Sequence, residues 1–136
     1  MIKGSCLCGA VAFEVRGEPI AFGFDHCSRC RKSSGSAFGA ELICRAADFR
    51  WSRGESSIRT YEAPVRETPP GYQRVFCQEC GAPVPGVRGD VVLVPAGAID
   101  DDPGIRPQGH IFVAYKAPWF EITDGLPQFA RKPPRM

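Results

Sequence analysis

Two closely spaced cysteine pairs constrain the fold of this chain more than any other feature. Cys6-x-Cys8 and Cys77-x-x-Cys80 each place two thiolates on a tight turn, so that both sulfurs of a pair can face one metal ion. Two such pairs supply the tetrahedral four-sulfur set that zinc prefers. A glycine follows each pair, and glycine readily adopts the positive φ that such a knuckle needs. The spacing predicts a structural zinc site; the alternatives are a disulfide framework or a group of buried thiols.

The total number of cysteines indicates the redox compartment in which the protein works. A third pair, Cys27-x-x-Cys30, and a single Cys44 bring the count to seven. An odd number fits a reducing compartment better than a fully paired disulfide scaffold. The N-terminal stretch has no apolar segment that marks secretion, and no run approaches the ~20 apolar residues of a membrane span. We expect a cytoplasmic protein in which Cys44 is a buried, inert thiol.

Length and composition favour one domain made of short strands. A chain of 136 residues with 43% hydrophobic residues can bury a core of its own. The formal net charge of +2 is too small to indicate nucleic acid or an anionic membrane as a partner. Thirteen prolines and fifteen glycines argue against long helices. We expect a single domain over residues 1–129, followed by a basic, proline-rich, frayed tail over residues 130–136.

Apolar patterning predicts an all-β fold with metal knuckles at strand ends. Gly9–Arg16 alternates as a half-buried strand does, with Glu14 and Arg16 on the polar face. Local helix is expected only at Ala46–Phe49 and in the Asp100–Asp102 turn, and a loop containing Pro64, Pro69 and Pro70 joins two of the strands. The predicted strands are Gly9–Arg16, Ile20–Asp25, Ala37–Cys44, Ser57–Glu62, Tyr72–Cys77, Val91–Val94 and His110–Tyr115.

Three cysteine blocks, in this order, carry a resemblance to a known family. The C-terminal stretch from His110 through Trp119 to Phe129 fits the same family. Together these segments resemble the glutathione-dependent formaldehyde-activating enzyme family, which includes a centromere-associated branch; a single C-x-x-C would be a weak signal. The blocks are Gly4-Ser5-Cys6-Leu7-Cys8-Gly9, His26-Cys27-Ser28-Arg29-Cys30-Arg31-Lys32 and Phe76-Cys77-Gln78-Glu79-Cys80-Gly81.

The resemblance implies a β-tent fold of small antiparallel sheets and two zinc sites of different character. The closed structural site matches Cys6, Cys8, Cys77 and Cys80. The second site of the family is a C-x-C-x-x-C run with three thiolates and one open position. Its second and third ligands match Cys27 and Cys30, whereas its first ligand falls on Asp25.

Asp25 stands where the family has its first cysteine ligand, and this difference changes how the site would bind zinc. A carboxylate oxygen binds zinc at about 2.0–2.2 Å but is a harder ligand than a thiolate. The site should therefore hold zinc less tightly than three thiolates would, and leave it a stronger Lewis acid. Three outcomes are open: Asp25 binds a catalytic zinc with Cys27 and Cys30, the site is empty, or the two cysteines form a disulfide on oxidation.

The family chemistry would use the open zinc position to stabilise a small thiol as its thiolate. That thiolate attacks an aldehyde carbon, and the reverse reaction breaks the carbon–sulfur bond. The resemblance implies glutathione as the thiol and formaldehyde as the aldehyde. Arg29, Arg31 and Lys32 lie beside the second site in the sequence and could pair with the carboxylates of glutathione, or form a solvated basic loop.

Several other residues are expected to be structural. Strand alternation points His26 away from its two neighbours, so it is interpreted as a hydrogen-bonding histidine, and His110 as packed or surface-exposed. Trp51 and Trp119 are expected in the core or at its rim, although either could wall a pocket. Asp100–Asp102 is expected to be an exposed turn.

Three classes of function remain. The first is a zinc-dependent carbon–sulfur lyase resembling S-(hydroxymethyl)glutathione synthase, with Asp25, Cys27 and Cys30 as catalytic residues. The second is a non-catalytic module that binds glutathione or another thiol beside a degenerate metal site. The third is a zinc-stapled interaction domain, against which the small net charge counts. Whether Asp25 takes the place of a thiolate at a working zinc site distinguishes the first two classes. We favour the enzyme.

Overall fold

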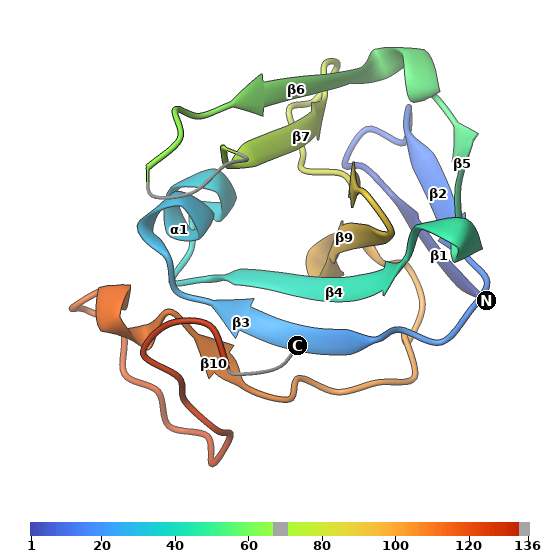
Figure 1. Cartoon of the computed structure of the whole chain (residues 1–136). Helices are drawn as coiled ribbons and strands as arrows, with labels where there is room; N and C mark the ends of the chain where they lie inside the picture. Colours follow the sequence, from blue (N-terminus) through green and yellow to red (C-terminus); the bar gives the residue numbers. More distant parts are fainter. Residues whose placement is uncertain (67–70, 134–136) are drawn as a thin grey trace.

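The computed structural model describes residues 1–66 and 71–133, which form three small β-sheets and one short α-helix (Figure 1). The first sheet is antiparallel, with the order β1 (Ile2–Ser5), β2 (Ala12–Val15) and β5 (Phe49–Arg53). The second has the order β10 (His110–Ile111), β3 (Ala21–Asp25), β4 (Gly39–Arg45), β9 (Val91–Pro95) and β8 (Gly86–Arg88). The third is the pair β6 (Ile58–Glu62) and β7 (Gln73–Cys77).

The mainly β fold predicted from the sequence is confirmed. Each predicted strand has a counterpart, and the sheets are antiparallel except where β10 runs parallel to β3. The strand expected over His110–Tyr115 is shorter than predicted, because Phe112 adopts a left-handed conformation (φ 54°) and a 3₁₀ turn follows at Val113–Tyr115. The strands β1, β5 and β8 were not predicted; each is short, with three to five residues.

The helical predictions were correct in one place and wrong in another. A 3₁₀ turn lies at Ala46–Asp48, as expected. Asp100–Asp102 is not helical, because the Asp100 N–H donates to Lys3 and the Asp102 carboxylate caps the backbone of Gly104 instead. These three aspartates do form an exposed turn, as predicted. Further 3₁₀ turns lie at Glu55–Ser57 and Ala96–Ala98.

The α-helix α1 (Ser28–Ser34) is the main element that the sequence pattern did not predict. It begins directly after Cys27, carries the buried Cys30 and ends at Gly35, whose left-handed conformation (φ 65°) suits a glycine. Figure 1 shows α1 at one end of the space between the β6–β7 pair and the β3–β4 part of the five-stranded sheet. This arrangement places the middle cysteine pair at the boundary between two sheets.

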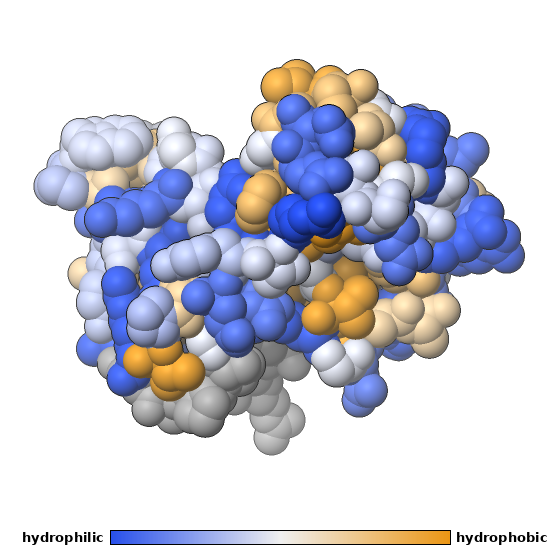
Figure 2. All heavy atoms as spheres, turned by 90° about the horizontal axis from the view of Figure 1, so that it is seen from above, coloured by the Kyte–Doolittle hydropathy of each residue, from blue (hydrophilic) through white to orange (hydrophobic). Residues whose placement is uncertain are grey.

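Two clusters of buried side chains hold the sheets together. The larger cluster joins the first and second sheets and includes Phe13, Leu42 and Cys44, so the buried thiol predicted at Cys44 is confirmed. The smaller one surrounds the outer cysteine pairs and includes Val11 and Val84. The outer surface seen in Figure 2 is mainly hydrophilic, with hydrophobic side chains in small separate groups.

The strand β2 is more deeply buried than its alternating sequence predicts. It is the central strand of its sheet, all four of its residues are buried, and Glu14 is only 8% exposed instead of facing solvent. The Glu14 carboxylate forms an ion pair with Arg50 of β5, which compensates for the loss of water. Arg16, at the end of the strand, is exposed as expected.

The proline-rich loop and the C-terminal tail expected from the sequence are only partly described by the structure. Pro69, Pro70 and residues 134–136 lie outside the described residues. The first part of the expected frayed tail is held in place, because the Phe112 N–H donates to the Arg131 carbonyl and the Ala114 N–H donates to the Ala130 carbonyl. None of the helices in the described part of the chain has the length and apolar character needed to cross a membrane.

Candidate functional site

The outer cysteine pairs converge on one point, as the spacing predicts. The sulfurs of Cys6, Cys8, Cys77 and Cys80 all lie within 4.8 Å of one another, with Sγ–Sγ distances of 3.7 Å between Cys6 and Cys8 and 3.9 Å between Cys8 and Cys77. Four sulfurs at these separations match the ligand set of a structural zinc ion. The residues present therefore fit a closed metal site that joins the N-terminal segment to the end of β7.

Both halves of this cluster turn at a glycine that donates a hydrogen bond back to the first cysteine of its pair. The Gly9 N–H donates to the Cys6 carbonyl at 3.1 Å, and the Gly81 N–H donates to the Cys77 carbonyl at 2.7 Å. Both glycines have positive φ values, 81° and 74°, which side chains of other residues disfavour. Each turn therefore folds back so that its two sulfurs face the same side.

Backbone N–H groups also stabilise negative charge on the sulfurs. The Val11 N–H donates to Cys6 Sγ at 3.3 Å, and the Glu79 N–H donates to Cys77 Sγ at 3.4 Å. The backbone of Ala82 lowers the pKa of the Cys80 thiol to about 6. Such hydrogen bonds favour the thiolate form that binds metal.

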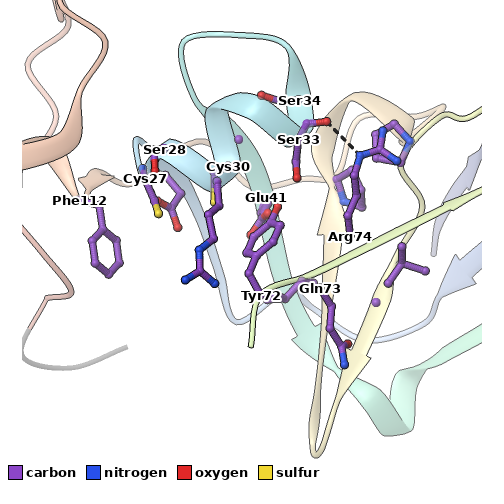
Figure 3. A pocket seen from close by; sticks show the side chains of 18 of the residues that line it. Cys27, Ser28, Cys30, Ser33, Ser34, Glu41, Tyr72, Gln73, Arg74 and Phe112 are labelled. Atoms are coloured by element: carbon purple, nitrogen blue, oxygen red, sulfur yellow. Dashed lines mark hydrogen bonds between the residues drawn. The ribbon is translucent and has the colours of Figure 1, made fainter. Parts of the chain in front are cut away.

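A cavity of about 460 Å³ lies on the other side of β7, between α1, the five-stranded sheet and the C-terminal segment. Asp25, Cys27 and Cys30, the predicted residues of the second site, all line it. Figure 3 shows the cysteine side chains at this cavity, together with Glu41, Tyr72 and Phe112. The volume is within the range of sites that bind small molecules.

Within this cavity the middle cysteines differ in their ionisation. Cys27 is half-buried at the start of α1, whereas Cys30 is 5% exposed. A hydrogen bond from the Cys30 side chain lowers the pKa of the Cys27 thiol to about 5. The same interaction, together with burial, raises the pKa of Cys30. Cys27 is therefore the more readily ionised thiol of the pair.

Asp25 ends β3 and faces the same cavity. Its Oδ1 accepts a hydrogen bond from the Cys27 backbone N–H at 2.9 Å, and burial raises the pKa of its carboxyl group. Among the described residues, the outer four-cysteine cluster is the only group of three or more potential ligands whose atoms lie within 4.8 Å of one another. Asp25, Cys27 and Cys30 thus share one corner of the cavity without converging as tightly.

Only one member of the predicted basic trio faces the cavity. Arg29 lines it, whereas Arg31 and Lys32 do not, and the Arg31 Nε is buried without a hydrogen-bond partner in the described residues. Five further cations line the cavity from segments far apart in the sequence, and they were not predicted as site residues. They are Arg66, Arg74, Arg88, Arg131 and Lys132.

Two other residues of the cavity were also missed. Burial, with a contribution from the charge of Asp25, raises the pKa of the Glu41 carboxyl group to about 7. Burial raises the pKa of Tyr72 to about 12. The signal for Glu41 was present in the sequence, because it is the one charged residue inside the predicted strand Ala37–Cys44.

His26 and His110 form a buried pair behind the cavity. His26 Nε2 lies 2.8 Å from His110 Nδ1, and His110 Nε2 lies 3.0 Å from the Asp124 carboxylate. Neither ring is more than 1% exposed, which confirms both as packed, hydrogen-bonding residues. Burial, with the charge of His110 next in importance, lowers the pKa of His26 to about 4. Trp51 packs against Phe13, and neither tryptophan lines the cavity.

The comparisons with known proteins agree with this architecture. The model of the family described as "Glutathione-dependent formaldehyde-activating enzyme" matches residues 1–115. The chain belongs to this family. A curated Halomonas elongata protein, named "Putative glutathione-dependent formaldehyde-activating enzyme", is 34% identical over 128 residues, which cover 90% of this chain and 81% of that protein.

A solved structure supports the fold as well. A crystal structure of a Rhodobacter sphaeroides protein matches with a TM-score of 0.56 and 26% sequence identity, covering 77% of this chain and 91% of that one. The resemblance to the glutathione-dependent formaldehyde-activating enzyme family inferred from the three cysteine blocks is therefore confirmed. The family match includes both outer cysteine pairs and the middle pair.

Proposed function

We propose that this protein makes or breaks the carbon–sulfur bond between the thiol of glutathione and an aldehyde, with formaldehyde as the aldehyde. The names of the family and of the Halomonas elongata relative support both substrates. The structural observation that carries the proposal is the cavity, in which a thiol–carboxyl corner lies beside an excess of positive charge.

The charges that line the cavity suit a thiol with carboxylate groups. Six basic side chains and two acidic ones line it among the described residues, although the whole chain has a formal net charge of only +2. Glutathione carries two carboxylates, which arginine binds through charge-assisted hydrogen bonds. Arg29 is the predicted substrate-binding residue that lines the cavity; Arg131 and Lys132 reach it from the C-terminal segment.

A second zinc ion would be held by Asp25, Cys27 and Cys30. When bound there it would supply Lewis acidity and favour the thiolate form of a substrate thiol. The thiol–carboxylate set is chemically suitable: Asp25 Oδ1 accepts the Cys27 N–H, which leaves Oδ2 as the oxygen that could bind a metal. The first zinc, at the outer cysteines, has a structural role in this proposal.

The looser spacing of Asp25, Cys27 and Cys30, compared with the outer four-cysteine cluster, favours one alternative: a thiol-binding protein with an incomplete second metal site. The experiment that separates the two follows formation and decay of the glutathione–formaldehyde adduct by NMR exchange, with and without added zinc. An enzyme accelerates the exchange above the uncatalysed rate. A binding module leaves the exchange rate unchanged while calorimetry still detects binding of glutathione.

A further inference from the structure

One carboxylate of the cavity has an unusual position on its strand. On β4, Leu42 and Cys44 face the buried core, so alternation turns Glu41 to the opposite, cavity-lining face. On this face Glu41 is opposite Pro95 of β9, and the next facing pair is Ile43 with Leu93. The Glu41 carboxylate therefore lies on a mainly apolar surface. Burying a charge there costs free energy unless the charge is paired or hydrogen-bonded.

Glycine at position 39 gives this carboxylate access to the thiol–carboxyl corner. Gly39 pairs with Asp25 across the β3–β4 ladder, two residues before Glu41 on the same face. A Cβ placed on Gly39 would lie 3.4 Å from the Cys30 Cβ and 3.6 Å from Glu41 Oε1. The absence of a side chain at Gly39 thus leaves a space that is bordered by Cys30 and by the Glu41 carboxylate.

Among the described residues, no ion pair involves Glu41. The ion pairs within residues 1–66 and 71–133 join Arg50 to Glu14, Arg106 to Asp102 and His110 to Asp124. Arg88 also lines the cavity but forms no ion pair with Glu41 in these residues. The Glu41 carboxylate is therefore available to a molecule that occupies the cavity.

We propose that Glu41 is a catalytic residue that carries the proton between sulfur and oxygen during carbon–sulfur bond formation, an inference that rests on the proposed function. The Glu41 carboxylate takes the proton from the substrate thiol, and the sulfur electron pair forms a bond to the aldehyde carbon. The π electrons of the C=O bond move to oxygen, which receives the proton from Glu41. The products are the hemithioacetal and an unchanged carboxylate, and cleavage is the reverse sequence.

The location of Glu41 explains why this residue serves both half-steps. A general acid–base group must reach both the sulfur and the oxygen of the reacting pair, and these atoms are separated by only one carbon. The carboxylates of the thiol are suited by other side chains that line the cavity, among them Arg29, Arg131 and Lys132. Binding and proton transfer are thus assigned to different side chains, which makes their contributions separable by substitution.

The test compares Glu41→Gln with wild type and with Glu18→Gln, an exposed glutamate outside the cavity. Adduct exchange is measured as a function of glutathione concentration. We expect Glu41→Gln to lower kcat by roughly 100-fold or more, as for loss of a general acid–base group, with KM changed less than about threefold. Glu18→Gln should match wild type.

Small carboxylates provide a second measurement. We expect acetate to restore exchange activity to Glu41→Ala in a concentration-dependent manner, because it can occupy the vacated space and carry the same proton. A residue needed only for folding would show no such rescue. If Glu41→Gln does not fold, rescue of Glu41→Ala decides the question, and absence of rescue overturns the proposal.

The outcomes distinguish this inference from the function on which it rests. Wild-type exchange at the uncatalysed rate would overturn both. Fast wild-type exchange with an unaffected Glu41→Gln variant would overturn the role of Glu41 alone. A Glu41→Gln variant altered only in KM would show that Glu41 binds substrate without transferring the proton, which also overturns the proposal.

Discussion

Replacing Cys77 with serine tests the structural role of the four-cysteine cluster most directly. Cys77 is fully buried, and its sulfur lies 3.9 Å from that of Cys8, which is 69 residues earlier in the chain. Closing a loop of this length costs about 4 kcal/mol of chain entropy, by the relation used for covalent cross-links. A metal ion bound at the cluster would offset this cost.

We therefore expect Cys77→Ser to lose at least about 4 kcal/mol of stability and its zinc. Unfolding entropy of about 2.1 cal/mol/K per residue over 136 residues converts this loss into a fall in Tm of about 15 °C. The assay is thermal unfolding with and without a chelator, combined with measurement of zinc per chain. A chelator should lower the Tm of wild type but have no further effect on Cys77→Ser.

Cys44→Ser is the matched control, because Cys44 is an equally buried thiol outside the cluster. Burying a hydroxyl in place of the thiol should cost about 1–3 kcal/mol. Its zinc content and its response to the chelator should equal those of wild type. A Cys77→Ser protein with wild-type zinc content and Tm would refute the assignment of the structural metal.

Three further predictions concern the second site and the histidine pair. Cys30→Ala should keep the fold and lose at most one metal equivalent, since its partner lies on the same local turn; global unfolding with loss of all metal would reverse the two roles. Asp25→Ala should weaken metal binding and activity together, whereas Asp25→Cys should bind zinc more tightly; a wild-type protein that gains activity only on Asp25→Cys would point to a thiol-binding module. His26 should remain neutral as the pH falls below its ordinary pKa of 6.5, so its contribution to stability is complete above that pH and is lost toward pH 4. NMR titration of the two histidine rings checks this, and a His26 ring that titrates near pH 6.5 contradicts it.

Local sequence pattern was sufficient to predict the two cysteine turns and most strands. The ligands of each pair are one or two residues apart, so the chain geometry between them is largely set by a glycine turn and needs little from the rest of the fold. The same is true of the strands, whose period-two alternation is a property of neighbouring residues. The short helix α1 escaped prediction because seven residues provide too few turns for a helical period to show.

Burial and the charges of the cavity depended on tertiary structure. Glu14 alternates like a solvent-facing residue, yet in the folded protein it is buried and forms an ion pair with Arg50 of β5. Arg131 and Lys132 appeared to belong to a frayed tail, yet backbone pairing with the segment after β10 brings them to the cavity of Asp25. Strand order and sheet packing bring together residues that are distant along the chain, and no local periodicity encodes those contacts.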